Sequence, residues 1–266
     1  MLTESTLSSG MRIWSAKPET SEPSPAVIFL HERYGPVQHP KDVVERFADN
    51  GYVAVLPDLF HRFQGDRTPI EQGEASHDLV DSESLEDLEE VMGWLKEQNY
   101  VIDDQIGIMG VCQTGREPVL YAAHHSDDVA SIVILNGAIY SREWTSRENH
   151  PEPMQDLLAA INCPVLCMMG EIDNLISLDD LARFRCEMEK NRKSYIAKVW
   201  RDTPHGWINN TMPGRYREGP AEEAWATLME FLGSTLGGDW DRSRVIWKFE
   251  ADTSPTYDFT KHVRWA

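Results

Sequence analysis

The chain has 266 residues, 41% of them hydrophobic and 26% charged, which is ordinary for a soluble globular protein with a sizeable core. Its 25 Lys and Arg residues against 44 Asp and Glu residues give a formal net charge of −19. This charge argues against nucleic acid or a membrane surface as a partner, because both attract a positive footprint. We expect no signal peptide and no membrane span, since no stretch approaches the ~18 apolar residues that a span needs. Four cysteines in a chain of this size do not indicate a disulfide framework, so a cytoplasmic location is expected.

Between residues 26 and 236 the chain alternates between two kinds of segment. Apolar runs rich in β-branched residues predict strands at 26–31, 52–57, 105–110, 130–136 and 164–170, with a further strand at 196–201. The first five runs lack polar alternation, which favours strands buried on both faces, as in a parallel sheet. Helical periodicity predicts helices at 41–52, 82–98, 115–125, 178–191 and 220–236. This order predicts one doubly wound, mostly parallel α/β domain over residues 1–238, with helices on both faces.

Residues 239–266 differ from the rest of the chain. They show no helical period, contain several aromatic residues and include one possible strand at Val245 to Phe249. Two interpretations stay open. This extension packs on its own domain, or it forms an arm that covers a neighbouring subunit and so makes a homodimer.

The segment 105–120 carries the strongest signal for chemistry. Its buried strand is expected to end at Gly110, Cys112 follows, and a helix begins near Gly115. A strand, a sharp turn and a helix are the setting in which a nucleophile elbow lifts a side chain above the sheet. The helix N-terminus would also stabilise a thiolate. The alternative is that Cys112 is a small buried core residue, as free cysteines often are.

A thiol nucleophile needs a base and a group that orients the base, and in this fold they follow in the order nucleophile, acid, histidine. Glu171 and Asp173 come directly after the predicted strand at 164–170. His205 lies in a loop between Pro204 and Gly206, after the strand at 196–201. The order therefore fits a catalytic triad.

Five short motifs occur in order along the chain: HERYG (31–35), GYVAVLPDLF (51–60), GVCQTG (110–115), GEID (170–173) and PHGW (204–207). With these motifs the chain resembles the dienelactone hydrolase family over about residues 10–236. The resemblance implies an α/β-hydrolase fold with a Cys–His–Asp triad. It makes Cys112 the nucleophile, His205 the general base, and Asp173, rather than Glu171, the residue that orients the histidine.

The resemblance also implies supporting groups around the nucleophile. Glu32 would contact the resting thiol and help to generate the thiolate, whereas the bland alternative is a surface glutamate paired with Arg33 or Arg62. The backbone N–H groups of Arg33 and Gln113 would form the oxyanion hole.

Two departures from the family pattern affect the expected substrate. Thr114 and Arg116 stand where small residues are usual, and Arg116 is expected to reach a carboxyl group. The arginines that hold the dienelactone carboxylate in the family are missing both after His205, where Asn209 and Asn210 stand, and from the acidic segment 71–90. Dienelactone itself is therefore not the expected substrate.

A pocket for a neutral or weakly polar ring compound is predicted instead. Its expected lining is His31, Tyr34, His61, Arg62, Phe63, Asn136, Trp144 and Trp207, with Arg116 as a further substrate-binding residue. Residues 137–156 are interpreted as a small lid above the carboxyl ends of the strands, where α/β sheets bind ligands, and Trp144 as its main contact. No metal spacing or Gly-rich phosphate loop is present, so no cofactor is expected.

These predictions lead to a function. The protein is expected to hydrolyse a small ester or an enol-lactone-like compound through an acyl-thioenzyme intermediate. Two alternatives stay open: hydrolysis of an amide or of a C–C bond in a ring-cleavage product, and a non-catalytic ligand-binding protein with the same fold.

Overall fold

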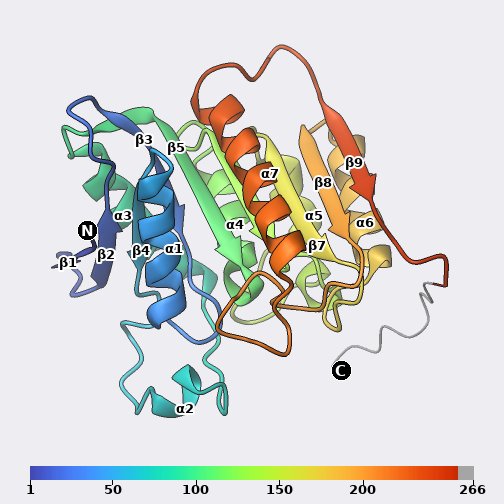
Figure 1. Ribbon diagram of the computed structural model, residues 1–266, viewed down its shortest axis with the longest axis horizontal. Coiled ribbons are helices and arrows are strands. Elements are labelled where there is room, and N and C mark those ends of the chain that lie inside the picture. The colour runs from blue at the N-terminus through green and yellow to red at the C-terminus, as the bar shows by residue number, and fades with distance from the viewer. Residues whose placement is uncertain (257–266) are drawn as a thin grey trace.

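A nine-stranded, mostly parallel sheet forms the centre of the computed structural model, which describes residues 1–256 (Figure 1). The strands are β1 (Thr3–Thr6), β2 (Arg12–Ala16), β3 (Ser24–Phe29), β4 (Val53–Pro57), β5 (Val101–Val111), β6 (Ser131–Leu135), β7 (Val165–Gly170), β8 (Tyr195–Trp200) and β9 (Trp247–Ala251). Their order across the sheet is β1-β2-β4-β3-β5-β6-β7-β8-β9. Only the β1–β2 and β2–β4 pairs are antiparallel.

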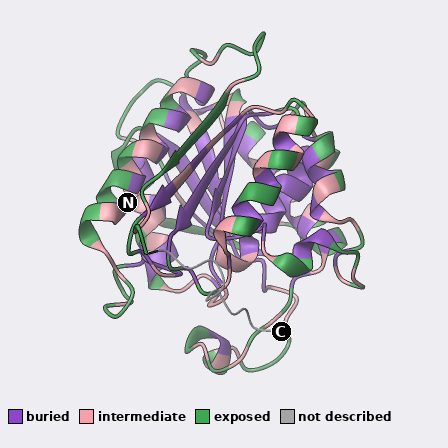
Figure 2. Cartoon of the chain, turned by 90° about the vertical axis from the view of Figure 1, so that its right-hand side faces the viewer, coloured by how far each residue is buried: buried purple, intermediate pink, exposed green. Residues whose placement is uncertain are grey.

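Helices cover both faces of this sheet (Figure 2). They are α1 (Gln38–Asp49), α2 (Thr68–Glu71), α3 (Asp81–Lys96), α4 (Arg116–His124), α5 (Met154–Ala160), α6 (Leu178–Lys190) and α7 (Glu218–Leu236), with short 3₁₀ helices η1 (Cys112–Gly115) and η2 (Ser141–Trp144). Helices α1 and α7 pack on one face, and α3, α4, α5 and α6 pack on the other. One buried apolar cluster lies between the sheet and the helices on each face. Burial of two such layers supplies the main driving force for this fold.

The chain reverses its direction across the sheet next to β3, which lies between β4 and β5. In an open α/β sheet, ligands bind in the crevice at such a switch point, outside the carboxyl ends of the strands. The motif HERYG follows β3, and GVCQTG spans the last two residues of β5 and the turn after it. The topology therefore brings both motifs to the edge of the sheet where ligands bind.

The predicted α/β-hydrolase fold class is confirmed, and each predicted strand or helix overlaps an observed one. Strands β1 and β2 and helices α2 and α5 were not predicted, and they are short elements of four to seven residues. No helix among residues 1–256 is long and apolar enough to cross a membrane.

Part of the C-terminal extension belongs to the sheet of its own chain. Strand β9 pairs in parallel with β8 and forms an edge of the sheet, with all five of its residues exposed. It includes Trp247 and Phe249, which are 48% and 43% exposed. The remaining predicted arm, residues 257–266, lies outside the described residues.

Candidate active site

The backbone at Cys112 makes the sharp turn of a nucleophile elbow. Cys112 follows β5 directly and has a φ of +55°, a conformation that costs energy for a non-glycine residue. The turn needs small neighbours: a Cβ atom on Gly110 would collide with the carbonyl group of Thr114, and one on Gly137 would collide with the carbonyl group of Cys112. A Cβ on Gly115 would lie 2.7 Å from the Cα of Gly137. These glycines allow the chain to present the cysteine side chain above the sheet.

Thr114, the departure from the family pattern, fastens this turn. Its buried hydroxyl accepts a hydrogen bond from the N–H of Val111 at 3.1 Å and donates to the carbonyl oxygen of His31 at 2.9 Å. The hydroxyl thus joins the end of β5 to the segment after β3. Threonine is accommodated because its hydroxyl pairs buried backbone groups, which costs less than leaving them unpaired.

Cys112, His205 and Asp173 come together as a hydrogen-bonded chain. His205 Nε2 lies 3.0 Å from Cys112 Sγ, and His205 Nδ1 lies 2.8 Å from Asp173 Oδ2. The other oxygen of Asp173 accepts backbone N–H groups of Leu175 at 2.7 Å and Ile176 at 3.1 Å. Asp173 is fully buried and His205 is nearly so. The carboxylate is therefore fixed by the backbone, and it fixes the imidazole in turn.

Glu171, the alternative acid, points elsewhere. It is buried and accepts the N–H of Asp202 at 2.9 Å. The choice of Asp173 over Glu171 therefore agrees with the geometry.

The electrostatics of this chain favour a charged histidine. Burial lowers the pKa of His205, but the negative charges of Cys112 and Asp173 and their hydrogen bonds outweigh it and raise the pKa well above 6.5. A cation next to a cysteine favours the thiolate, which is the nucleophilic form. By contrast, burial raises the pKa of Cys163 to about 12 and that of Cys167 higher still. All four cysteines are free thiols, and only Cys112 has a histidine partner among the described residues.

Glu32 lines the cavity next to the nucleophile, but its hydrogen-bond partner is Asn209 and not the predicted one, the thiol of Cys112. It is 8% exposed, lines the cavity next to Cys112, and Oε2 accepts a hydrogen bond from Asn209 Nδ2 at 3.0 Å. The thiol itself is hydrogen-bonded to His205. Neither Arg33 nor Arg62 pairs with Glu32, so the surface ion pair of the alternative interpretation is not formed among the described residues.

A two-lobed cavity opens around Cys112. One lobe, of about 360 Å³, is called the Arg215 lobe, and the other, of about 280 Å³, the Arg142 lobe. Both lobes are lined by Arg33, Cys112, Asn136, Leu175 and His205. The Arg215 lobe adds Glu32, Tyr34, Val111, Asn174, Gly206, Met212 and Arg215, and the Arg142 lobe adds Ser76, Asp78, Gln113, Tyr140, Ser141 and Arg142. The predicted lining residues Tyr34 and Asn136 are among them.

Three arginines line this cavity, and sequence reasoning missed their side chains. Arg215 stands ten positions after His205, and the loop between β8 and α7 folds back so that its guanidinium comes near Gly206. Arg142 donates to the hydroxyl of Tyr140 at 2.7 Å, and Arg33 donates to the carbonyl of Ala75 at 2.9 Å. The lining predicted from the sequence named Arg62 and Arg116 instead, and it lacked the side chains of Arg33, Arg142 and Arg215.

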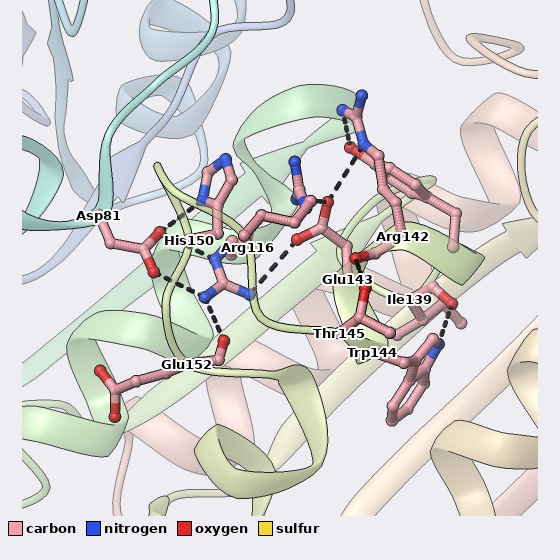
Figure 3. A network of polar contacts seen from close by, with 11 residues as sticks. Asp81, Arg116, Ile139, Arg142, Glu143, Trp144, Thr145, His150 and Glu152 are labelled. Atoms are coloured by element: carbon pink, nitrogen blue, oxygen red, sulfur yellow. Dashed lines mark hydrogen bonds and ion pairs between the residues drawn. The ribbon is translucent and has the colours of Figure 1, made fainter. Parts of the chain in front are cut away.

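Arg116 lies in a buried ion network and does not line the cavity (Figure 3). Its guanidinium donates to Asp81 at 2.9 and 2.6 Å, to Glu143 at 3.3 Å and to the carbonyl of Glu152 at 2.6 Å. His150 completes the network at 2.6 Å from Asp81. Arg116 does reach carboxyl groups, as expected, but they belong to the protein rather than to a substrate. This corrects the predicted substrate-binding role.

Three other residues predicted to line the pocket contact other residues of the protein instead. Trp144 is 3% exposed and donates to the carbonyl of Ile139 at 2.8 Å, and Trp207 is fully buried against Trp200 with ring centroids 5.1 Å apart. Arg62 pairs with Asp87 at 2.5 Å. His31, His61 and Phe63 are likewise absent from the lining of both lobes. The segment 137–156 does border the cavity, but through Tyr140, Ser141 and Arg142 rather than through Trp144.

Comparison with known proteins identifies the family of this chain. The model of the dienelactone hydrolase family matches residues 11–236, and the chain belongs to this family of α/β-hydrolases. A protein assigned as a carboxymethylenebutenolidase from Escherichia coli O157:H7 is 29% identical over 230 residues, which cover 84% of this chain and 82% of that protein. A Bradyrhizobium protein assigned as a 2-oxo-3-(5-oxofuran-2-ylidene)propanoate lactonase is 29% identical over 226 residues, 84% of this chain and 89% of its own.

A solved structure gives the same result. The crystal structure of a protein assigned as a dienelactone hydrolase from Klebsiella pneumoniae subsp. pneumoniae superimposes with a TM-score of 0.77 at 26% identity. The match covers 88% of this chain and 98% of that one. The protein is a hydrolase of the lactone- and ester-cleaving kind.

Proposed function

We propose that this protein hydrolyses a small lactone or ester through an acyl-thioenzyme formed on Cys112, with His205 and Asp173 as its partners. The observation that carries the proposal is the position of His205, whose two ring nitrogens lie 3.0 Å from the thiol and 2.8 Å from the buried carboxylate. A nucleophile, a base and a group that orients the base, all within hydrogen-bond distance, define nucleophilic catalysis.

In the first step the thiolate of Cys112 attacks the substrate carbonyl carbon, and the carbonyl π electrons move onto oxygen. Collapse of this tetrahedral intermediate breaks the acyl C–O bond, and the departing oxygen takes the proton from Nε2 of His205. The raised pKa of His205 supplies this proton at neutral pH. The enzyme is then acylated, and in a lactone the alcohol stays attached to the acyl chain.

In the second step neutral His205 takes a proton from water, and the oxygen of that water attacks the thioester carbonyl. The C–S bond breaks, the thiolate leaves, and the carboxylic acid is released. The imidazolium and thiolate are then restored. Asp173 stabilises the imidazolium in both steps, because it faces Nδ1 from a fully buried position.

The developing oxyanion needs donors, and two backbone N–H groups near Cys112 are candidates for this role. Arg33 is the second residue of a turn closed by the hydrogen bond from the N–H of Gly35 to the carbonyl of Glu32 at 3.1 Å, which leaves the Arg33 N–H outside that bond. Gln113 lies in the first turn of η1, where N–H groups have no partner within the helix. Both residues line the cavity at Cys112. We assign them the oxyanion hole, with side-chain identity unimportant for this role.

The arginine lining favours a substrate that carries a carboxylate. Arg33, Arg142 and Arg215 outnumber the acidic lining residues Glu32 and Asp78, in a chain whose net charge is −19. Such a local reversal attracts an anion that the rest of the surface would repel. The name of the Bradyrhizobium relative describes a lactone with a propanoate group, which has the same combination of features.

Initial rates for a panel of lactones, esters and amides, with and without a carboxylate, test this proposal. Wild type should turn over carboxylate-bearing lactones or aryl esters, and Cys112→Ala should lose at least ~10³-fold, as expected when a nucleophile is removed. Cys186→Ala, which changes an exposed thiol, serves as the matched control and should keep the wild-type rate. Full activity in Cys112→Ala would overturn the proposal, and turnover of none of the panel would favour a ligand-binding protein.

A further inference from the structure

Asn136 is a buried amide in the cavity, and among residues 1–256 its side chain makes no hydrogen bond. It is 1% exposed, and neither Oδ1 nor Nδ2 has a partner among the described residues. Its backbone is held, because its N–H donates to the carbonyl of Met168 at 3.0 Å. Buried polar groups are nearly always hydrogen-bonded, since an unpaired one costs about 1–3 kcal/mol. An amide left without a protein partner at this position therefore points to a ligand.

The position of Asn136 places this amide next to the nucleophile. Leu135, the residue before it, pairs with Val111, the residue before Cys112, across the β5–β6 ladder. Gly137, the residue after it, packs against the backbone carbonyl of Cys112. Asn136 also lines both lobes of the cavity. A substrate whose carbonyl carbon faces the thiol would therefore have its neighbouring atoms beside this amide.

Backbone geometry does not account for the amide. Asn136 has a φ of +48°, a left-handed conformation in which asparagine is more common than most residues. Glycine adopts it more easily still, and it would leave no polar group to bury. The chain already uses glycine at the next position, Gly137. The side chain of Asn136 therefore has a use that the turn alone does not require.

The chemistry of the amide defines what it can recognise. Its oxygen accepts and its nitrogen donates, so a complementary ligand offers a donor and an acceptor on neighbouring atoms. A carboxylate has acceptors only and would set its charge against the amide oxygen. The arginines of the cavity suit that group better. A hydroxyl group beside a carbonyl or ring oxygen satisfies both atoms of the amide, because the hydroxyl donates to Oδ1 and the adjacent oxygen accepts from Nδ2.

We propose that Asn136 is a specificity-determining residue that selects 2-hydroxy esters or 2-hydroxy lactones, by binding the hydroxyl and the oxygen next to it beside the reacting carbonyl. The proposal rests on the proposed hydrolysis at Cys112. A site that hydrogen-bonds a substrate hydroxyl strongly rejects an analogue without that hydroxyl, because the buried polar groups of the site are then left unpaired. The preference should therefore appear in kcat/KM as a ratio between matched substrates.

Two substrate pairs measure this ratio: 2-hydroxy-γ-butyrolactone against γ-butyrolactone, and phenyl glycolate against phenyl acetate. Wild type should prefer the hydroxylated member of each pair by at least ~10-fold. In Asn136→Gly, which tolerates the positive φ, the ratio should fall towards the ratio that the same pair shows with hydroxide in the absence of enzyme. In Asn136→Asp, which keeps the acceptor and loses the donor, the ratio should lie between the values for wild type and Asn136→Gly. Asn99→Ala is the matched control, because Asn99 is an exposed amide that lines neither lobe, and it should keep the wild-type ratio.

A second measurement does not depend on turnover. Glycolamide should protect Cys112 from iodoacetamide better than acetamide does in wild type, and this difference should vanish in Asn136→Gly. Loss of all hydrolysis together with this selective protection would remove the proposed reaction and keep the recognition by Asn136. A wild-type ratio near one in both measurements, or a ratio that Asn136→Gly leaves unchanged while its thermal unfolding matches wild type, would overturn the inference.

Discussion

The buried network around Arg116 provides a sharp test of the claim that this residue supports the fold and does not bind substrate. The side chains of Arg116, Asp81 and Glu143 are only 3%, 5% and 3% exposed, and four hydrogen bonds of 2.6–3.3 Å hold the guanidinium. Arg116→Met keeps most of the side-chain volume and removes the charge. It leaves the buried carboxylate of Asp81 with His150 as its remaining partner, whereas Glu143 keeps Arg142 and Arg147.

Removing one partner of a buried ion pair costs about 3–5 kcal/mol, because the remaining charge stays out of water uncompensated. For a chain of this size, a loss of that order lowers Tm by about 6–10 °C, at ~2 °C for each kcal/mol. Asp81→Asn in the Arg116→Met background should recover part of the loss, because it removes the buried carboxylate that has lost its arginine.

The assay is urea unfolding followed by circular dichroism, with kcat/KM measured in parallel at a temperature where both proteins are folded. The midpoint should shift without a change in slope, and kcat/KM per folded molecule should stay within about threefold of wild type. A loss of stability below about 1 kcal/mol, or a large rise in KM for a carboxylate substrate with unchanged stability, would refute the reasoning.

The network should also make the stability of the protein depend on pH. Burial raises the pKa of Asp81, but Arg116 and His150 outweigh it, and the pKa lies below 3.8 in the folded chain. A carboxyl group whose pKa is depressed by folding contributes stability that is present above its unfolded pKa and lost as the pH falls through the folded value. The difference in stability between wild type and Arg116→Met should therefore shrink in acid, below about pH 4.

Three further predictions follow from the active site. Cys112 should react with iodoacetamide faster than Cys186 and keep its rate below neutral pH, because the raised pKa of His205 preserves the ion pair, whereas an ordinary thiol loses about tenfold in thiolate per pH unit. Peptide mass spectrometry measures both rates, and equal pH profiles for the two cysteines would contradict this prediction. In steady-state assays, Arg215→Gln should raise KM about tenfold for a carboxylate-bearing ester and leave KM for the matching neutral ester nearly unchanged. Equal effects on the two KM values would exclude binding of a carboxylate at Arg215. Thr114→Val should lower the free energy of unfolding by about 1–3 kcal/mol in urea, because the buried groups that the hydroxyl pairs lose their partner; a neutral result would mean that the hydroxyl is dispensable.

The sequence was most informative where a single local pattern carries the signal. The buried apolar runs predicted the parallel strands, and the strand–cysteine–helix order predicted the elbow at Cys112, because periodicity and chain order are local properties. Strand β1 escaped because it has four residues, none of them buried. Strand β2 is nearly as short, at five residues.

Side-chain partners from distant segments could not be read in the same way. Arg116 meets Asp81, 35 positions away, and Glu143, 27 positions away, so its satisfaction by the protein depends on the tertiary fold. Arg215 enters the cavity only because the loop after β8 folds back over the histidine. A search for charges beside His205 in the sequence misses such a residue, and a search across the whole loop up to α7 would have found it.

The central claim, that Cys112 carries the acyl group, is tested most directly by trapping the intermediate. Wild type is mixed with a chromogenic aryl ester, quenched in acid within milliseconds to seconds, and measured by intact-protein and peptide mass spectrometry. We predict a mass increase equal to one acyl group, located on the peptide that contains Cys112 and absent in Cys112→Ala. Steady turnover of the ester with no acyl group on Cys112, or with the acyl group on another residue, would contradict it.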